Sequence, residues 1–160
     1  MELKSRKDVP VELTWDLSSI YASEEAMNQD VEKAKKLRDH IVETYKGKLN
    51  TPQNINACLD EYREVIRLFI LTCDYCNLAV SVDFYDAYNQ ERDNKMKRIL
   101  AESLGMLKFI DSEIMEAKEC IIEQALSDTV ENRHYLQDVL RNKPHKLHAE
   151  TERALAALSQ

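Results

Sequence analysis

The chain has 160 residues, the length of one domain, and a net charge of −7 from 29 acidic and 22 basic residues. Its two short basic runs, 33–38 and 141–146, are flanked by acidic residues, so we expect neither nucleic acid nor a membrane surface as a partner. With only two glycines and three prolines, the sequence favours long helices and few turns.

The most apolar stretch, 68–82, is shorter than the roughly 20 residues that a bilayer span needs, and Asp74 and Asn77 interrupt it. We therefore expect no transmembrane helix. The charged N-terminus is followed by no apolar segment of the kind found in secretory signals. These features predict a cytoplasmic protein whose four cysteines are reduced thiols.

Residues 1–22 are expected to form an anchoring arm, and residues 23–160 a single helical domain. The arm's apolar residues are spaced as in an extended segment or a short turn that lies on a core. They are Val9, Leu13, Trp15, Leu17, Ile20 and Tyr21.

The first predicted helix begins after Ser23, which is a suitable N-cap because two glutamates follow it in the first turn. It ends at Gly47, a residue that readily adopts positive φ at a helix C-terminus. Its apolar stripe predicts one buried face: Met27, Val31, Ala34, Leu37, Ile41 and Tyr45.

Thr51 and Pro52 are a second start signal, a capping hydroxyl followed by proline at the first helical position. The helix that begins here is expected to be the longest and to end near 81–84. Alternating spacings of four and three predict a seam packed lengthwise on neighbouring helices. The seam comprises Ile55, Leu59, Tyr62, Ile66, Phe69, Cys73, Cys76 and Val80.

A third helix is predicted from Asp86 to about Phe109, with Gly105 inside it for a close helix contact at a cost of about 1 kcal/mol. We expect Met96, Ile99, Leu100, Leu104, Leu107 and Ile110 to face inward, and Glu91, Arg92, Lys95, Lys97 and Glu102 to face outward.

Three shorter helices follow in the prediction. One is capped by Asp111 or Ser112 and runs through Leu126, one covers Val130 to Asn142 before Pro144, and the last covers 149–158. The predicted fold class is therefore all-α, an antiparallel bundle of about five to six helices preceded by an extended N-terminal arm.

Two groups of residues have spacings that could bind a metal ion or, for the cysteines, exchange disulfides. Cys73 and Cys76 have C-x-x-C spacing, but no second such pair is present and both fall on the apolar seam, so we interpret them, like Cys58 and Cys120, as core thiols. A small redox or metal protein using Cys73 and Cys76 stays open as an alternative. His145 and His148 follow Pro144 in a predicted turn, and we do not expect them to bind metal.

The remaining polar residues suggest no active site. We interpret His40 and His134 as surface and interface residues, and the carboxylates as outward groups paired with bases, such as Glu91 with Lys95 and Glu113 with Lys118. The sequence has neither a Gly-x-Ser-x-Gly elbow nor a glycine-rich phosphate loop.

Four short blocks in order resemble the N-terminal region of oligoendopeptidase F enzymes, which belong to the thimet-oligopeptidase-like superfamily of zinc metallo-oligopeptidases. The resemblance extends from about Arg6 onward; Met27, where relatives often carry tryptophan, and His148, where we would expect a capping serine, depart from it. The blocks are Val9-Pro10 with Leu13-Thr14-Trp15-Asp16-Leu17-Ser18 and Ile20-Tyr21; Tyr45-Lys46-Gly47-Lys48-Leu49; Phe109-Ile110-Asp111-Ser112-Glu113-Ile114; and Arg133-His134-Tyr135-Leu136 with Leu140-Arg141, Pro144-His145 and Leu147.

The resemblance implies a nearly all-helical zinc peptidase whose catalytic His-Glu-x-x-His helix lies far C-terminal to this segment. No catalytic, cofactor-binding or metal residue of the family maps onto this sequence, so zinc is expected in the parent enzyme only and the segment should be inactive alone. The N-terminal helices would form one wall of a channel that admits short peptides and excludes folded proteins. The implied partners are the C-terminal catalytic domain and short peptides.

An excised piece of such an enzyme is our first interpretation, because the sequence stops at Gln160 after an Ala/Leu-rich helix with no polar tail. We then expect exposed apolar faces at Leu155 and Leu158, and at Cys76 and Val80, through which the isolated piece would self-associate. The alternative is a free-standing helical interaction module that uses the long seam helix to bind a partner helix or itself.

Overall fold

The computed structural model describes residues 9–145, apart from the side chain of Val11. In this range it contains six α-helices, three short 3-10 helices and no strand, which confirms the all-α helical bundle. The elements are η2 (Val11–Leu13), η3 (Leu17–Ser19), α1 (Glu24–Tyr45), α2 (Pro52–Val82), α3 (Ala87–Leu107), α4 (Phe109–Glu116), α5 (Glu119–Ser127), α6 (Arg133–Asn142) and η4 (Lys143–His145).

The described chain divides into two compact units, each built from two stretches of sequence. The first unit comprises 9–46 and 60–109, and the second comprises 47–59 and 110–145. Helix α2 contributes its first part to the second unit and the rest to the first. The proposed boundaries, an arm of 1–22 and a domain of 23–160, stay a prediction.

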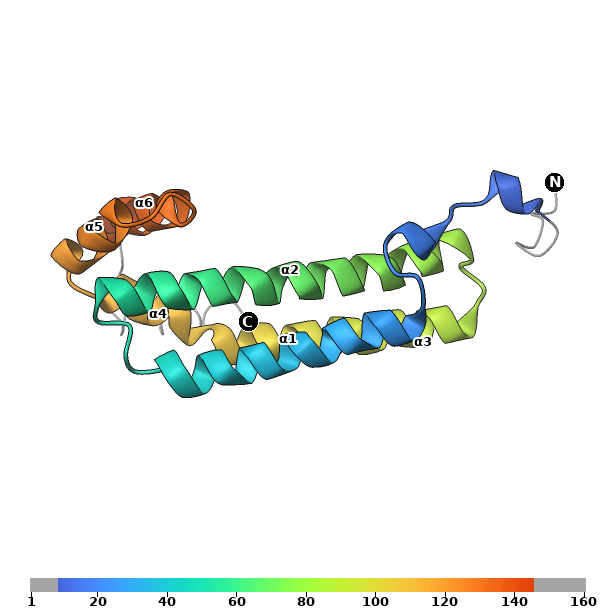
Figure 1. The fold of residues 1–160 in the computed structure, drawn as a ribbon, viewed down its shortest axis with the longest axis horizontal. Coiled ribbons are helices and arrows are strands. Elements are labelled where there is room, and N and C mark those ends of the chain that lie inside the picture. Colours follow the sequence, from blue (N-terminus) through green and yellow to red (C-terminus); the bar gives the residue numbers. More distant parts are fainter. Residues whose placement is uncertain (1–8, 146–160) are drawn as a thin grey trace, which may run out of the picture. The chain divides into compact units, whose positions relative to one another are not determined.

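In the first unit, α1, most of α2 and α3 lie side by side with successive helices antiparallel (Figure 1). Helix α1 begins as predicted, since Ser23 Oγ accepts a hydrogen bond from the Ala26 N–H at 3.2 Å. It is followed by Gly47 with φ +78°. Five of its six predicted core residues are buried, namely Met27, Val31, Ala34, Ile41 and Tyr45, whereas Leu37 is only half-buried.

Helix α2 starts and ends where predicted, with Thr51 Oγ1 accepting from the Asn54 N–H at 3.3 Å. Its seam was predicted only in part, because Tyr62, Ile66, Cys73 and Val80 are half-buried. The buried stripe is wider than a two-helix seam, since α2 packs against both α1 and α3 in the first unit. It contains Ile55, Cys58, Leu59, Val65, Leu68, Phe69, Thr72, Cys76 and Ala79.

By length and composition, α2 is also apolar enough to cross a membrane. This differs from our sequence expectation, which considered only the stretch 68–82. Long core helices pass the same test, so it is weak evidence for a membrane span. The buried stripe of α2 is occupied by protein: the Cys76 thiol lies 3.5 Å from the Met27 sulfur of α1.

Helix α3 follows Asp86, whose carboxylate accepts from the Tyr88 N–H at 2.9 Å. Its inward face differs from the prediction, since Asp93 and Ser103 are buried and Leu104 is 41% exposed. Ser103 is inward because it bonds across the bundle: its hydroxyl accepts from Arg38 of α1 at 3.0 Å. Gly105 makes no close contact, contrary to prediction, because a Cβ there would meet nothing within 4 Å.

In the second unit, the single helix predicted from 111 to 126 is two helices, α4 and α5, with a break at Ala117 and Lys118. Lys143 explains the break, since its ammonium group donates to the backbone carbonyls of Met115 and Ala117 and so satisfies the end of α4. Asp111 lies inside α4 and is not its cap. Helix α6 begins at Arg133, three residues after the predicted start at Val130. The predicted helix at 149–158 lies outside the described residues.

Candidate functional site

The C-x-x-C pair lies in the interior of the first unit. Cys76 is fully buried and Cys73 is half-buried, both within α2. Burial raises the pKa of the Cys76 thiol to about 11 and also raises the pKa of Cys73, so neither is a ready thiolate at neutral pH. The prediction that Cys76 exposes apolar surface is therefore wrong. Leu155 and Leu158 lie outside the described residues.

The other two cysteines differ from each other. Cys58 is buried, as a core thiol should be, whereas Cys120 is exposed in the first turn of α5. The apolar neighbours Ile121 and Ile122 misled the prediction, because Ile122 faces the core and position 120 lies on another side of the helix.

Histidines and carboxylates are dispersed. Among residues 9–145, no three His, Cys, Asp or Glu side chains are grouped so as to hold a metal ion. His40 is exposed, with its Nε2 at 3.6 Å from Glu61 of α2, and His134 is exposed on α6. His145 is exposed in η4, and His148 lies outside the described residues.

Residues of the second, third and fourth sequence blocks that resemble oligoendopeptidase F meet in the second unit, where they make structural contacts. The Glu113 carboxylate accepts from the backbone N–H of Gly47 at 2.7 Å and of Leu49 at 3.4 Å. This replaces the predicted outward pairing with Lys118. The Tyr135 hydroxyl donates to Asp111 at 2.7 Å, which joins the third and fourth blocks.

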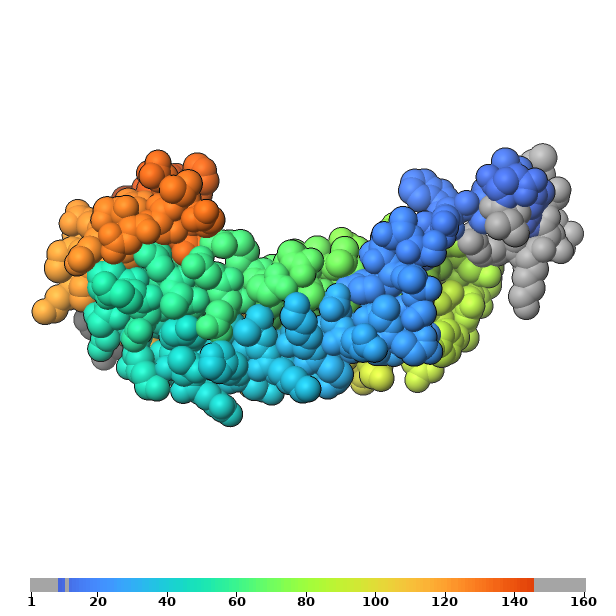
Figure 2. All heavy atoms as spheres, in the orientation of Figure 1, coloured from blue at the N-terminus to red at the C-terminus, as the bar shows by residue number. Residues whose placement is uncertain are grey.

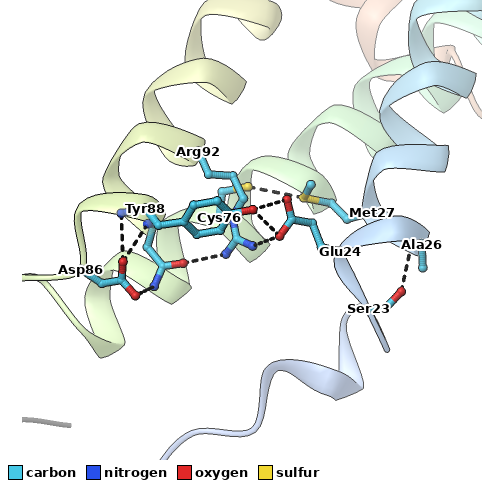
Figure 3. A network of polar contacts seen from close by, with 9 residues as sticks. Ser23, Glu24, Ala26, Met27, Cys76, Asp86, Tyr88 and Arg92 are labelled. Carbon is cyan, nitrogen blue, oxygen red and sulfur yellow. Dashed lines mark hydrogen bonds and ion pairs between the residues drawn. The ribbon is translucent and has the colours of Figure 1, made fainter. Parts of the chain in front are cut away.

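A polar cluster joins α1, α2 and α3 at one end of the first unit (Figure 3). The Arg92 guanidinium lies 5.2 Å from the ring centre of Tyr75 and 5.6 Å from that of Tyr88, and it binds Glu24 at 3.2 Å. The Tyr88 hydroxyl also donates to Glu24, at 2.6 Å. Only 13% of the Arg92 side chain is exposed, so the predicted outward orientation of Arg92 is wrong. Its partners come from three helices, which periodicity within one helix cannot reveal.

The same unit carries exposed large apolar side chains in the arm and in the α2–α3 loop, which we call the arm patch. It consists of Leu13 and Trp15 of the arm and Phe84 and Tyr85 of the α2–α3 loop, which are 67–85% exposed. A pocket of about 460 Å³ adjoins it, with arm residues on one side and Leu78 and Val82 of α2 on the other. Figure 2 shows the arm (blue) beside the end of the unit where α2 and α3 meet (yellow-green).

The arm patch was only partly foreseen. The sequence predicted an arm laid on a core, and Tyr21 is indeed buried, whereas Trp15 is 75% exposed. Leu13 and Trp15 remain largely exposed although they line the same pocket as Leu78 and Val82 of α2. The adjacent aromatic residues Phe84 and Tyr85, between two strong helix signals, were the available clue, because such short connections normally carry polar residues.

Comparison with known proteins supports the resemblance. The family model for M3 peptidase N-terminal domains, described as oligopeptidase F, matches residues 113–160. Oligopeptidase PepF of Bacillus subtilis (strain 168) is 23% identical over 99% of this chain and 24% of its own length. Group B oligopeptidase PepB of Streptococcus agalactiae serotype III (strain NEM316) is 22% identical over 98% of this chain and 26% of its own.

Oligoendopeptidase F of Lactococcus lactis subsp. cremoris is 21% identical over 98% of this chain and 27% of its own. The chain thus spans about a quarter of the length of the curated relatives it matches. No solved structure matches it. The relatives align with nearly the whole chain, and the family match begins at Glu113, within the third block, and covers the fourth. On these matches, the chain is similar to the M3 peptidase N-terminal domains of oligopeptidase F-like proteins.

Proposed function

We propose that this chain is the non-catalytic N-terminal helical domain of a longer zinc metallopeptidase, in which it forms one wall of a channel that limits access to short peptides. The observation that carries this proposal is the pattern of coverage. Almost all of the chain aligns with oligopeptidases, yet it accounts for only 24–27% of their length. The catalytic residues would then lie in the other three quarters.

The chemistry of the described residues supports a structural role for the segment. Its shared sequence blocks are occupied with internal contacts, as in the Glu113 bonds to Gly47 and Leu49. Burial raises the pKa of the Cys73 and Cys76 thiols, and among residues 9–145 no three His, Cys, Asp or Glu side chains are grouped so as to hold a metal ion. A zinc peptidase needs two imidazoles and a carboxylate around one metal ion, and we assign these to the remainder of the longer protein.

The gene downstream of the codon for Gln160 provides the first test. We expect an in-frame His-Glu-x-x-His sequence there, and we expect the longer product to bind one zinc ion and to cleave a quenched fluorescent octapeptide. The 160-residue chain, assayed alone, should do neither. A stop codon directly after Gln160, or stoichiometric zinc in the 160-residue chain, would refute the proposal; the stop codon would favour a free-standing interaction module.

The channel wall is tested separately in the longer protein. A short peptide carrying a photoreactive group at one end should label residues within 1–160, because the wall borders the bound peptide. The same group attached to a folded protein should leave this segment unlabelled. Labelling confined to residues beyond 160 would show that the domain does not line the path of the peptide.

A further inference from the structure

One flank of the α1–α2 pair carries a row of polar contacts between the two helices, which lie side by side in the first unit (Figure 1). Lys33 of α1 binds Glu64 of α2 at 3.3 Å. Farther along α1, the Tyr45 hydroxyl donates to Glu61 of α2 at 2.8 Å. His40 lies between Lys33 and Tyr45, with its Nε2 at 3.6 Å from Glu61 Oε2. The row thus includes an imidazole, the side chain whose charge ordinarily changes between pH 5 and 8.

The Glu61 carboxylate has a hydrogen bond at one oxygen only. Its Oε1 accepts from Tyr45, whereas its Oε2 is buried and has no hydrogen-bond partner among residues 9–145. An oxygen that loses its water without gaining a donor destabilises the folded state. Because the His40 Nε2 lies only just beyond hydrogen-bond distance, a small rotation of its side chain brings a donor to this oxygen.

Protonation of His40 supplies the donor that Glu61 Oε2 lacks. The neutral imidazole carries one N–H, and the Thr44 hydroxyl, 3.4 and 3.5 Å from the two ring nitrogens, is a competing partner for it. The imidazolium carries two N–H groups, so Nε2 donates toward Glu61 whichever nitrogen contacts Thr44, and opposite charges then attract. We propose that His40 and Glu61 form a pH-dependent clasp, which holds α1 to α2 more tightly at pH 5.5 than at pH 8.

The charges on α1 around the clasp nearly balance. Positions three, four and seven residues from His40 lie on its side of the helix, and those that bear a charge are Lys33, Lys36 and Glu43. Lys33 is bound to Glu64, and Glu43 offsets the positive charge of Lys36. The charge of His40 therefore depends mainly on the carboxylate across the flank.

On α2, the charged position related to Glu61 by the same spacings is Glu64, which Lys33 occupies. Helix α3 meets α1 at Arg38, which donates to Ser103. Arg38 lies two positions from the clasp histidine and so on another side of α1. Within the described part of the chain, Glu61 is the carboxylate within ion-pair distance of the imidazole.

The contact of Lys33 with Glu64 is an internal reference, because its charges stay the same between pH 5.5 and 8. Hydrogen bonds from Arg67 and Lys33 lower the pKa of Glu64 to about 2, and a lysine ammonium group keeps its proton in this range. The two contacts join the same helices on the same flank. Only the one made by His40 should respond to pH, and its contribution is lost as the imidazole gives up its proton.

Native-state amide hydrogen exchange of residues 40–45 in the 160-residue chain, corrected for intrinsic exchange rates, tests the clasp at pH 5.5 and 8. His40→Gln should lower the protection of this segment about threefold at pH 5.5 and leave it unchanged at pH 8. Lys33→Gln should lower it by the same factor at both pH values. An effect of His40→Gln that is equal at the two pH values, or absent at pH 5.5, would overturn the proposal.

A double-variant cycle identifies the partner of His40. In a Glu61→Gln background, His40→Gln should leave the protection at pH 5.5 unchanged, because the amide carries no charge to attract an imidazolium. A threefold loss that persists in this background would show that His40 acts through another group and would refute the clasp. His134→Gln, at an exposed position of α6, is the matched control and should have no effect at either pH. The clasp is a property of the chain itself, so these results bear on it independently of the function proposed above.

Discussion

The carboxylate of Glu113 accepts a hydrogen bond from the backbone N–H of Gly47 at 2.7 Å, across 66 positions of sequence. It holds the loop between α1 and α2 against α4 within the second unit, and it serves the Leu49 N–H as well. One side chain thereby satisfies two backbone donors that follow a helix.

Replacing this carboxylate should destabilise the chain. We expect Glu113→Ala to lower the free energy of unfolding by about 1–3 kcal/mol, because two N–H groups lose a charged acceptor. Glu113→Gln should cost less, since an amide oxygen can still accept. Urea denaturation followed by circular dichroism measures both, with Glu123→Ala at an exposed position of α5 as the control. An unchanged midpoint for Glu113→Ala would show that water replaces the carboxylate at no cost.

Replacement of each glycine by alanine should change the stability of the chain, in opposite directions at the two positions. Gly105→Ala adds a Cβ into open space within α3 and should stabilise the chain by about 1 kcal/mol. Gly47→Ala should destabilise it by about 1–2 kcal/mol, because φ +78° is a left-handed conformation that alanine adopts at a cost. Thermal unfolding of the pair under one set of conditions is the measurement. A loss of stability in Gly105→Ala would mean that α3 has a neighbour at this position.

The Arg92 cluster should contribute to the stability of the first unit. Arg92→Met retains the apolar stem but removes the ring contacts and the bond to Glu24, and we expect a loss of about 1–2 kcal/mol. Tyr88→Phe removes only the exposed hydroxyl bond to Glu24 and should cost less than Arg92→Met. Arg98→Met, exposed on the same helix, is the control. Additive losses in the double variant would indicate that Arg92 and Tyr88 act independently, contrary to their shared partner.

Thiol labelling should separate the four cysteines by burial and ionisation. At pH 8 we expect iodoacetamide to modify Cys120 at least tenfold faster than Cys76, which is fully buried and whose pKa is raised to about 11. Mass spectrometry of the digested protein gives the rates, and a Cys120→Ser variant confirms the assignment of the fast site. Comparable rates for the two thiols would show that local unfolding exposes Cys76 of α2 frequently.

The raised pKa of Cys76 also predicts alkaline destabilisation. Between the usual thiol pKa of 9.0 and about 11, the unfolded chain loses the proton while the folded chain keeps it. The free energy of unfolding should therefore fall as pH rises through this window. At pH 8 the thiol keeps its proton in both states, so this destabilisation should be absent. Cys76→Ala should flatten this part of the stability profile; a profile identical to that of the wild-type chain would refute the assignment.

Local sequence signals, mainly N-cap residues, predicted most of the helix boundaries correctly. Ser23, Thr51 and Asp86 each precede a helix and bind its first N–H groups, so the starts of α1, α2 and α3 can be derived from three short stretches of sequence. The break between α4 and α5 could not, because the group that satisfies its carbonyls is Lys143, some 26 residues away.

The burial of side chains on α3 and in the arm likewise could not be derived from local sequence signals. Periodicity within α3 placed Arg92 outside and Leu104 inside, and both placements were wrong. Arg92 lies over Tyr75 of α2 and binds Glu24 of α1, and the neighbouring Ser103 is buried with its bond to Arg38 of α1. The block that contains Trp15 carried part of the resemblance, but the apolar spacing of the arm did not predict that Trp15 is 75% exposed. Spacing along the chain does not specify how a short segment of 3-10 turns lies on a helix.

The division of α2 between the two units has a consequence for the order in which the chain assembles. Residues 47–59 leave the ribosome well before residues 110–145, with which they form the second unit. Pairing them directly requires closure of a loop of about 50 residues, an entropic cost that grows slowly with length. Formation of the α2–α3 hairpin replaces that loop with a structured one, so we expect the first unit to be the template on which the second is completed during synthesis.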